Sequence, residues 1–191
     1  MRRREFLVGG LASLAAAGRA ESVAARIRSV AKETLWRNRD GRSTTWFHPR
    51  ACMVPGADGG ARALRTLQPI TGSDYFGPVH WSASEDLGRT WSDPVPIPSL
   101  GRKGVAGHEG LEQGVCDVVP EFHARSGTVL ALGHSVFYRG DRFSKGDQLA
   151  RYPVYSVRRG DGGWSEARRL EWDDPRGGEI YTNGCGQRVT L

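Results

Sequence analysis

The chain has 191 residues, of which 38% are hydrophobic and 25% charged, and its formal net charge is +6. This composition is that of a folded globular protein and excludes an intrinsically disordered chain. The positive charge does not indicate nucleic-acid binding. Part of it comes from Arg2, Arg3 and Arg4, and no basic run elsewhere is interleaved with aromatic residues as a single-strand groove requires. We therefore expect no nucleic-acid partner.

Residues 1–20 have the pattern of an export signal. Paired arginines precede Phe6 and Leu7, an apolar stretch of small residues follows, and Ala17 and Ala20 are candidate cleavage positions. The pattern resembles a bacterial twin-arginine signal, which implies export of a folded protein to the periplasm or the exterior. The apolar stretch is too short to span a membrane, so no membrane association is expected after cleavage. The alternative is a helix that begins the mature domain.

Residues 21–44 are expected to be a helical or linker segment, since Val23, Ile27 and Val30 recur at helical spacing. After Asp40 and Gly41 the period changes to two residues, which is typical of strands. The 26 glycines, 10 prolines and six tryptophans also favour a turn-rich all-β fold over a helical bundle. Short strand-like runs, separated by turn clusters, occupy residues 45–54, 62–68, 78–84, 114–119, 128–136 and 152–158. No helix is long enough to connect parallel strands, so an antiparallel meander is predicted for residues 45–191.

The octapeptide at residues 84–91, SEDLGRTW, describes a turn that bonds to itself between two strands. The side chains of Ser84 and Asp86 can accept hydrogen bonds from nearby backbone N–H groups. Gly88 can take a positive φ in the tight bend. Thr90 and Trp91 then re-enter a strand, with the indole as a packing anchor.

This octapeptide resembles the Asp box, S-x-D-x-G-x-T-W, of the sialidase (neuraminidase) superfamily, in which such turns repeat around a six-bladed β-propeller. The resemblance implies that residues 84–91 are a structural element rather than a catalytic one. A degenerate second copy is predicted at Trp164 and Ser165, after a glycine-rich turn. Its distance from the first copy is long for one blade and indicates an insertion at 100–113 or 139–150.

Propellers close with four to eight four-stranded blades, and residues 45–191 are enough for about three. We therefore expect a partial propeller, either the N-terminal portion of a longer sialidase-like protein or a truncated reading frame. An open arc exposes an edge strand, so missing blades or a partner chain would be needed to cover it.

Sialidases bind the carboxylate of the sugar with arginines, use an Asp as acid/base, and use a Tyr nucleophile activated by a Glu. Arg50, in the sequence FHPRACMVP, resembles the first of these arginines. Asp74 follows Arg50 and precedes the octapeptide, as the acid/base does in the family, and the flanking Tyr75 and Phe76 would lower the dielectric around it. The alternatives are an exposed strand arginine and an aspartate that only forms a turn.

Asp117 begins a strand in the region where sialidases place an Asp that contacts the sugar; capping of a blade end is its alternative role. His48 and His80 lie near the candidate residues and are expected to line the pocket. The five histidines are spread singly, without the short paired spacing of a helix-borne zinc site. No metal and no cofactor is therefore expected.

Glu179, Tyr181 and Arg188 match the remaining catalytic residues by type only, so the expected nucleophile and later arginines are missing from this chain. The resemblance implies, for the full-length form, a glycoside hydrolase acting on sialic acid or other acidic glycans. The alternative is a non-catalytic propeller module that binds carbohydrate or protein. In that module clustered tryptophans would stack on sugar faces or else pack between blades: Trp46, Trp81, Trp91, Trp164 and Trp172.

The three cysteines, Cys52, Cys116 and Cys185, give neither a zinc pattern nor a complete disulfide framework. One pair could oxidise after export, but the spacing does not say which. Cys52 and Cys116 each fall inside a strand-like run, where a cysteine is typically a small buried apolar residue.

Overall fold

The structure is a computed structural model that describes residues 29–34, 37–38, 41, 44–56, 58–72, 74–143, 145–149, 151–160 and 162–171. The predicted leader, most of the segment 21–44, and Glu179, Tyr181, Cys185 and Arg188 lie outside the described residues. The chain divides into two compact units between Glu33 and Thr34, and the strands found among the described residues belong to the second. No helix among the described residues has the length and hydropathy of a membrane span.

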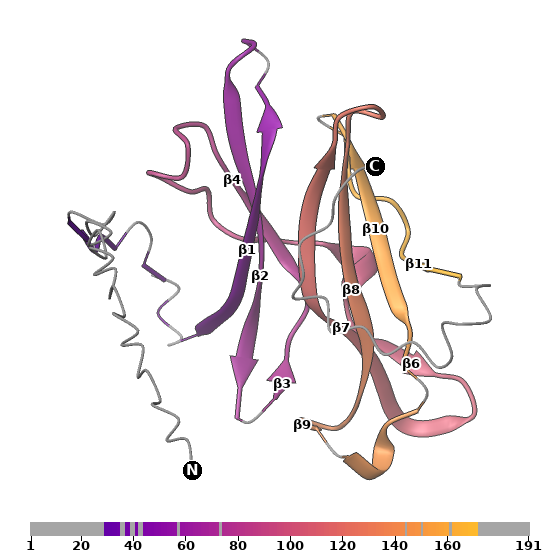
Figure 1. Cartoon of the computed structure of the whole chain (residues 1–191). Coiled ribbons are helices and arrows are strands. Elements are labelled where there is room, and N and C mark those ends of the chain that lie inside the picture. Colours follow the sequence, from indigo (N-terminus) through magenta and orange to yellow (C-terminus); the bar gives the residue numbers. More distant parts are fainter. Residues whose placement is uncertain are drawn as a thin grey trace, which may run out of the picture. The chain divides into compact units, whose positions relative to one another are not determined.

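The first sheet is an antiparallel meander with the order β1-β2-β4-β5 (Figure 1). Its strands are β1 (Thr45–Pro55), β2 (Ala61–Thr71), β4 (His80–Ser84) and β5 (Val95–Pro96), and a short β3 (Tyr75–Phe76) pairs with the end of β2. Residues 63–68 of β2 are all buried, which is typical of a strand covered on both faces.

The second sheet is also an antiparallel meander, with the order β11-β10-β8-β7-β6. Its strands are β6 (Lys103–Val105), β7 (His108–His123), β8 (Thr128–Arg139), β10 (Pro153–Arg159) and β11 (Arg168–Arg169), and β9 (Arg142–Phe143) pairs with the end of β8. Short 3-10 helices occupy Pro98–Leu100 and Lys145–Asp147. The prediction of an all-β fold with antiparallel strands is confirmed.

Additional elements occupy the two segments where the sequence predicts an insertion. β6 lies within 100–113, and β9 with the second 3-10 helix lies within 139–150. Without them the second sheet has four consecutive meander strands, β7-β8-β10-β11, in the same arrangement as β1-β2-β4-β5. Each sheet therefore contains one copy of the same four-strand unit.

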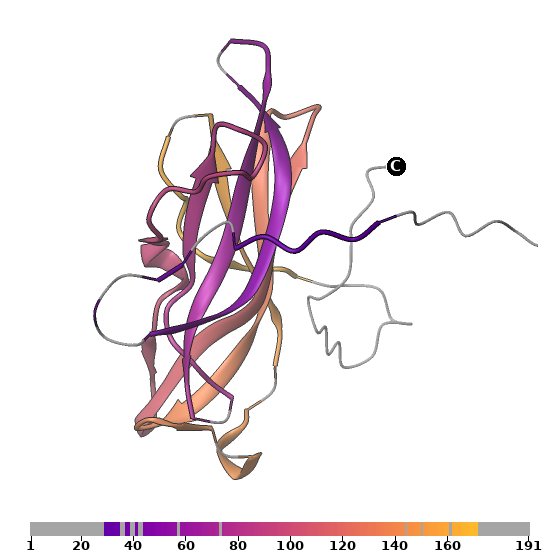
Figure 2. The ribbon, with the colours of Figure 1, turned by 90° about the vertical axis from the view of Figure 1, so that its left-hand side faces the viewer.

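The two sheets pack through β1 and β2 of the first and β7 of the second. They lie side by side in Figure 1, and Figure 2 looks onto the first sheet with the second behind it. Aliphatic side chains from both sheets and from the segment joining them form the core: Val79, Ile97, Leu100, Val115, Val118, Ala131 and Val154. Polar bonds cross the interface as well, because Thr66 Oγ1 donates to the carbonyl of Val118 at 2.6 Å and Gln68 Nε2 donates to that of Val115 at 2.8 Å.

Two of the tryptophans are half-buried and pack against this core. Trp81 of β4 and Trp164, which follows β10, meet edge to face with ring centroids 6.3 Å apart. The guanidinium of Arg158 lies over the Trp81 ring at 4.6 Å. Much of the surface of these indoles is therefore used in packing one unit against the other, which was the alternative to stacking on a sugar.

Candidate functional site

The octapeptide forms a closed network of hydrogen bonds between β4 and β5. Ser84 Oγ accepts from the N–H of Gly88 at 2.7 Å and donates to Asp86 Oδ1 at 2.8 Å. Asp86 also accepts from the N–H of Thr90 at 2.8 Å and from its hydroxyl at 2.7 Å, while Trp91 Nε1 donates to the carbonyl of Gly88 at 3.0 Å. These bonds, led by that from the Thr90 N–H, lower the pKa of Asp86 to about 2. Every polar group of Asp86 is thereby engaged in the turn.

Ser84 is the buried centre of this network, and we expect Ser84→Ala to lower the free energy of unfolding by about 1–2 kcal/mol, because the Gly88 N–H loses its acceptor. Thr90→Val removes only the exposed hydroxyl bond to Asp86 and should cost less. Urea unfolding of both variants measures the difference. A larger loss for Thr90→Val than for Ser84→Ala would contradict the central role of Ser84.

The two four-strand units share a serine lock that holds the third strand to the segment after its turn. In the first unit the N–H of Ser92 donates to the carbonyl of Ala83 at 2.9 Å, and Ser92 Oγ accepts from the Ala83 N–H at 3.0 Å. In the second, Ser165 makes the same two bonds with Val157, at 2.8 and 3.0 Å. Each serine follows a tryptophan, and the locked residues are nine positions apart in one unit and eight in the other. The two units therefore share this pair of bonds at the same place in their strand order.

Three of the predicted site residues have left-handed backbone conformations. His48, Asp74 and Asp117 have φ values of 50°, 56° and 53°. Such values are uncommon for residues other than glycine and cost of order 1–3 kcal/mol each, so they gather at functional sites more often than elsewhere. His48 and Asp117 also sit in β-bulges, where the register of β1 shifts between Phe47 and Arg50 and that of β7 shifts between Cys116 and Val119.

These bulges bring predicted residues from different strands together. His48 Nδ1 lies 2.9 Å from Asp117 Oδ1, which joins β1 to β7, and the ring of His48 stacks on Phe76 with centroids 5.1 Å apart. Burial lowers the pKa of His48; Asp117 and Asp74 oppose this shift and Arg50 adds to it, so all three charged groups lie within electrostatic range of the imidazole. We call His48, Arg50, Asp74 and Asp117 the bulge cluster.

Within the bulge cluster, Asp74 is exposed in the turn between β2 and β3, while the side chains of His48 and Asp117 are 22% and 16% exposed. His80 has different neighbours: its Nδ1 lies 2.8 Å from the carbonyl of Pro78 and its ring meets that of Trp46 edge to face at 4.9 Å. The structure therefore groups four of the five residues predicted to act on the substrate.

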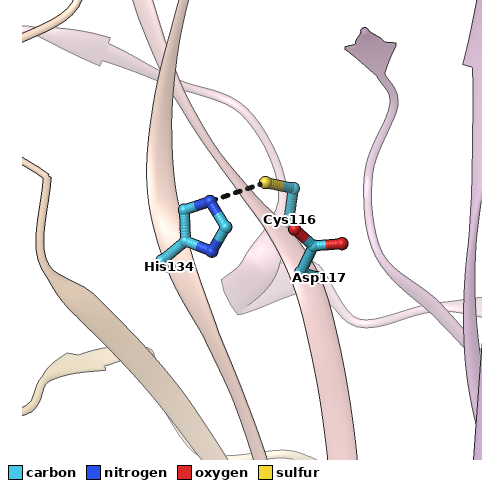
Figure 3. Close-up of side chains that lie close together, drawn as sticks. All are labelled: Cys116, Asp117 and His134. Atoms are coloured by element: carbon cyan, nitrogen blue, oxygen red, sulfur yellow. Dashed lines mark hydrogen bonds between the residues drawn. The ribbon is translucent and has the colours of Figure 1, made fainter. Parts of the chain in front are cut away.

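Two residues that the sequence did not single out as functional lie beside the bulge cluster. Cys116 Sγ is 3.2 Å from His134 Nε2, and a ligand atom of each lies within 4.8 Å of a carboxylate oxygen of Asp117 (Figure 3). Cys116 is 5% exposed and His134 is 2% exposed. The contact depends on the pairing of Cys116 with His134 across β7 and β8, which strand periodicity does not specify.

A pocket of about 500 Å³ lies beside the second turn, lined by Tyr155, Val157, Arg159, Gly162, Gly163, Trp164, Ser165 and Arg168. None of these residues belongs to the bulge cluster, and the described residues of the lining include two arginines and no carboxylate. Among the described residues, we therefore take the bulge cluster as the candidate site. Comparison with known proteins adds no family assignment, because no protein-family model and no curated protein sequence matches the chain.

Proposed function

We propose that this chain is part of an exported sialidase-like β-propeller that acts on terminal glycosides of acidic sugars. The observation that carries the proposal is the bulge cluster, in which His48 and Asp117 meet at 2.9 Å and the charges of Arg50 and Asp74 act on the same imidazole. Three of its four residues, His48, Asp74 and Asp117, have left-handed backbone conformations. The repeated four-strand unit, with its serine lock between the third and fourth strands, supports propeller blades as the architecture. A twin-arginine leader is in keeping with an extracytoplasmic glycan as substrate.

Each member of the cluster has a role suited to an acidic sugar. The guanidinium of Arg50 can pair with the glycan carboxylate through two parallel hydrogen bonds. Asp74, exposed at the hairpin between β2 and β3, is free of packing that would keep it from the glycosidic oxygen and can supply the proton to the leaving group. Asp117, held by His48 at 2.9 Å, can accept a hydrogen bond from a sugar hydroxyl.

The test is turnover of a fluorogenic sialoside by the protein expressed from its complete reading frame. We expect Asp74→Asn to lower kcat about 100-fold or more, since a general acid contributes a factor of that order or larger. Arg50→Ala should raise KM about 10- to 100-fold, because it removes charge-assisted bonds to the carboxylate. Asp93→Asn is the matched control, because Asp93 is exposed and lies next to the structural turn rather than in the cluster.

Full turnover by Asp74→Asn would contradict the acid/base role. Binding of sialylated glycans by the wild-type protein without any hydrolysis would instead favour the second candidate, a propeller module that binds carbohydrate without cleaving it.

A further inference from the structure

Cys116, Asp117 and His134 present three metal-binding side chains to one point between β7 and β8. We propose that they form a binding site for a divalent transition metal ion, with zinc as the ion that best fits a thiolate, an imidazole and a carboxylate. The proposal rests on the geometry of these residues and not on the proposed glycosidase activity.

The backbone explains how three such groups come to one side of the sheet. Cys116 and His134 are directly paired across β7 and β8, so their side chains share a face. Asp117 would normally point to the opposite face, because successive residues of a strand alternate. Its φ of 53° and the register shift between Cys116 and Val119 break that alternation, and its carboxylate joins the other two ligands instead.

The distances suit a single ion after a small adjustment of the three side chains. Two ligands of one tetrahedral zinc lie about 3.5 Å apart, given Zn–N and Zn–S bonds of about 2.0–2.3 Å. Cys116 Sγ and His134 Nε2 are already 3.2 Å apart, and all three ligand atoms lie within 4.8 Å of one another. A thiolate and a carboxylate also balance the charge of a divalent cation, which compensates for placing it among buried residues.

His48 supplies the outer contact that metal sites in proteins commonly have. Its Nδ1 lies 2.9 Å from Asp117 Oδ1, a contact that can orient the carboxylate beside the ion. Asp117 and His48 are partly exposed whereas Cys116 and His134 are buried, which makes the Asp117 side the entry path and the place for a fourth ligand such as water. The same burial argues against Cys116 as a nucleophile toward a large substrate.

The test is titration of the chelator-treated, reduced protein with Co²⁺, which reports ligand type by its spectrum. We expect one Co²⁺ per chain, a thiolate-to-cobalt charge-transfer band together with the intense visible bands of a tetrahedral site, and displacement of both by Zn²⁺. Cys116→Ser should remove the charge-transfer band, and His134→Gln should weaken Zn²⁺ binding about 100-fold or more. His48→Ala should weaken Zn²⁺ binding about 10- to 100-fold.

Cys52→Ser is the matched control, because Cys52 lies in β1 and is not one of the three proposed ligands. This variant should leave the cobalt spectrum and the Zn²⁺ affinity unchanged. Cys116 and His134 are buried, so folding of each variant is checked by circular dichroism. A measurement on the wild-type protein does not depend on the variants: Zn²⁺ should protect Cys116 from alkylation in partly denaturing conditions, as read by mass spectrometry. Co²⁺ binding without a thiolate band, or alkylation of Cys116 at the same rate with and without Zn²⁺, would overturn the proposal.

Discussion

Gly133→Ala is expected to lower the free energy of unfolding by about 3 kcal/mol, the upper part of the range for overpacking a buried site. A Cβ added at Gly133 of β8 would lie 2.5 Å from the carbonyl oxygen of Cys116 and 2.7 Å from Val118 Cγ2. The nearest atom belongs to the backbone of β7, so no side-chain rotation relieves the contact. Cys116 pairs with His134 and Val119 with Leu132, so Gly133 lies opposite the bulge around Asp117. The missing side chain at Gly133 leaves room for that bulge.

Urea unfolding measures this loss, with Gly104→Ala as the matched control. Gly104 is also a strand glycine, but a Cβ there would meet nothing within 4 Å, and we expect its variant to stay within about 0.5 kcal/mol of wild type. The Gly133→Ala variant should also lose the thiolate-to-cobalt band, because a shift of the β7 backbone would move Cys116 and Asp117. Equal stability of the two variants would show that the bulge does not need the space at position 133.

Leu100→Ala is expected to cost about 3 kcal/mol, a typical value for a buried leucine, because it removes transfer free energy and leaves a cavity. Leu100 is 1% exposed in the 3-10 helix Pro98–Leu100, on the segment that leads from the first sheet to the second. It belongs to one buried cluster with Val79, which directly precedes β4 of the first sheet, and with Val115 and Val118 of β7 in the second. Both sheets therefore lose contacts from one truncation.

The control for this variant is Leu170→Ala, because Leu170 is 39% exposed and follows β11. We expect it to cost well under 1 kcal/mol. Differential scanning calorimetry of both proteins also tests whether the sheets unfold together: a single lowered transition for Leu100→Ala agrees with a shared core. Two separated transitions, with only one of them lowered, would contradict it.

The long strands could be predicted from the sequence because alternation is a local property. Each strand-like run overlaps an observed strand, as 45–54 does with β1 and 128–136 with β8. β7 begins at His108, six residues before the predicted run at 114–119. Its first three residues are exposed, and this part of the strand pairs with β6 and with the end of β8. Because these residues lie away from the core, they lack the alternating pattern from which a strand is predicted. The strands of two or three residues are too short for any period to show.

The site was predictable only in part, for a related reason. Arg50, Asp74 and Asp117 are identified through the resemblance and their order along the chain. The contact of His48 with Asp117 and that of Cys116 with His134 arise from bulges and from strand register. Register depends on which residues face each other across strands distant in sequence, and a one-residue shift exchanges the two faces of a strand. No spacing within the chain carries that information.

The serine lock holds the third strand of each four-strand unit to the segment after the turn, and it does not depend on the Ser84–Asp86 motif in that turn. In the second unit Arg158 and Gly160 follow Val157, where Ser84 and Asp86 follow Ala83 in the first, yet Ser165 still makes both of its bonds. A unit of this kind can therefore lose the serine and aspartate of the octapeptide motif and keep the two backbone-anchoring bonds of its serine lock. Related units are therefore better sought by a tryptophan-serine pair whose serine lies eight or nine residues after a half-buried residue of the third strand than by the acidic motif itself.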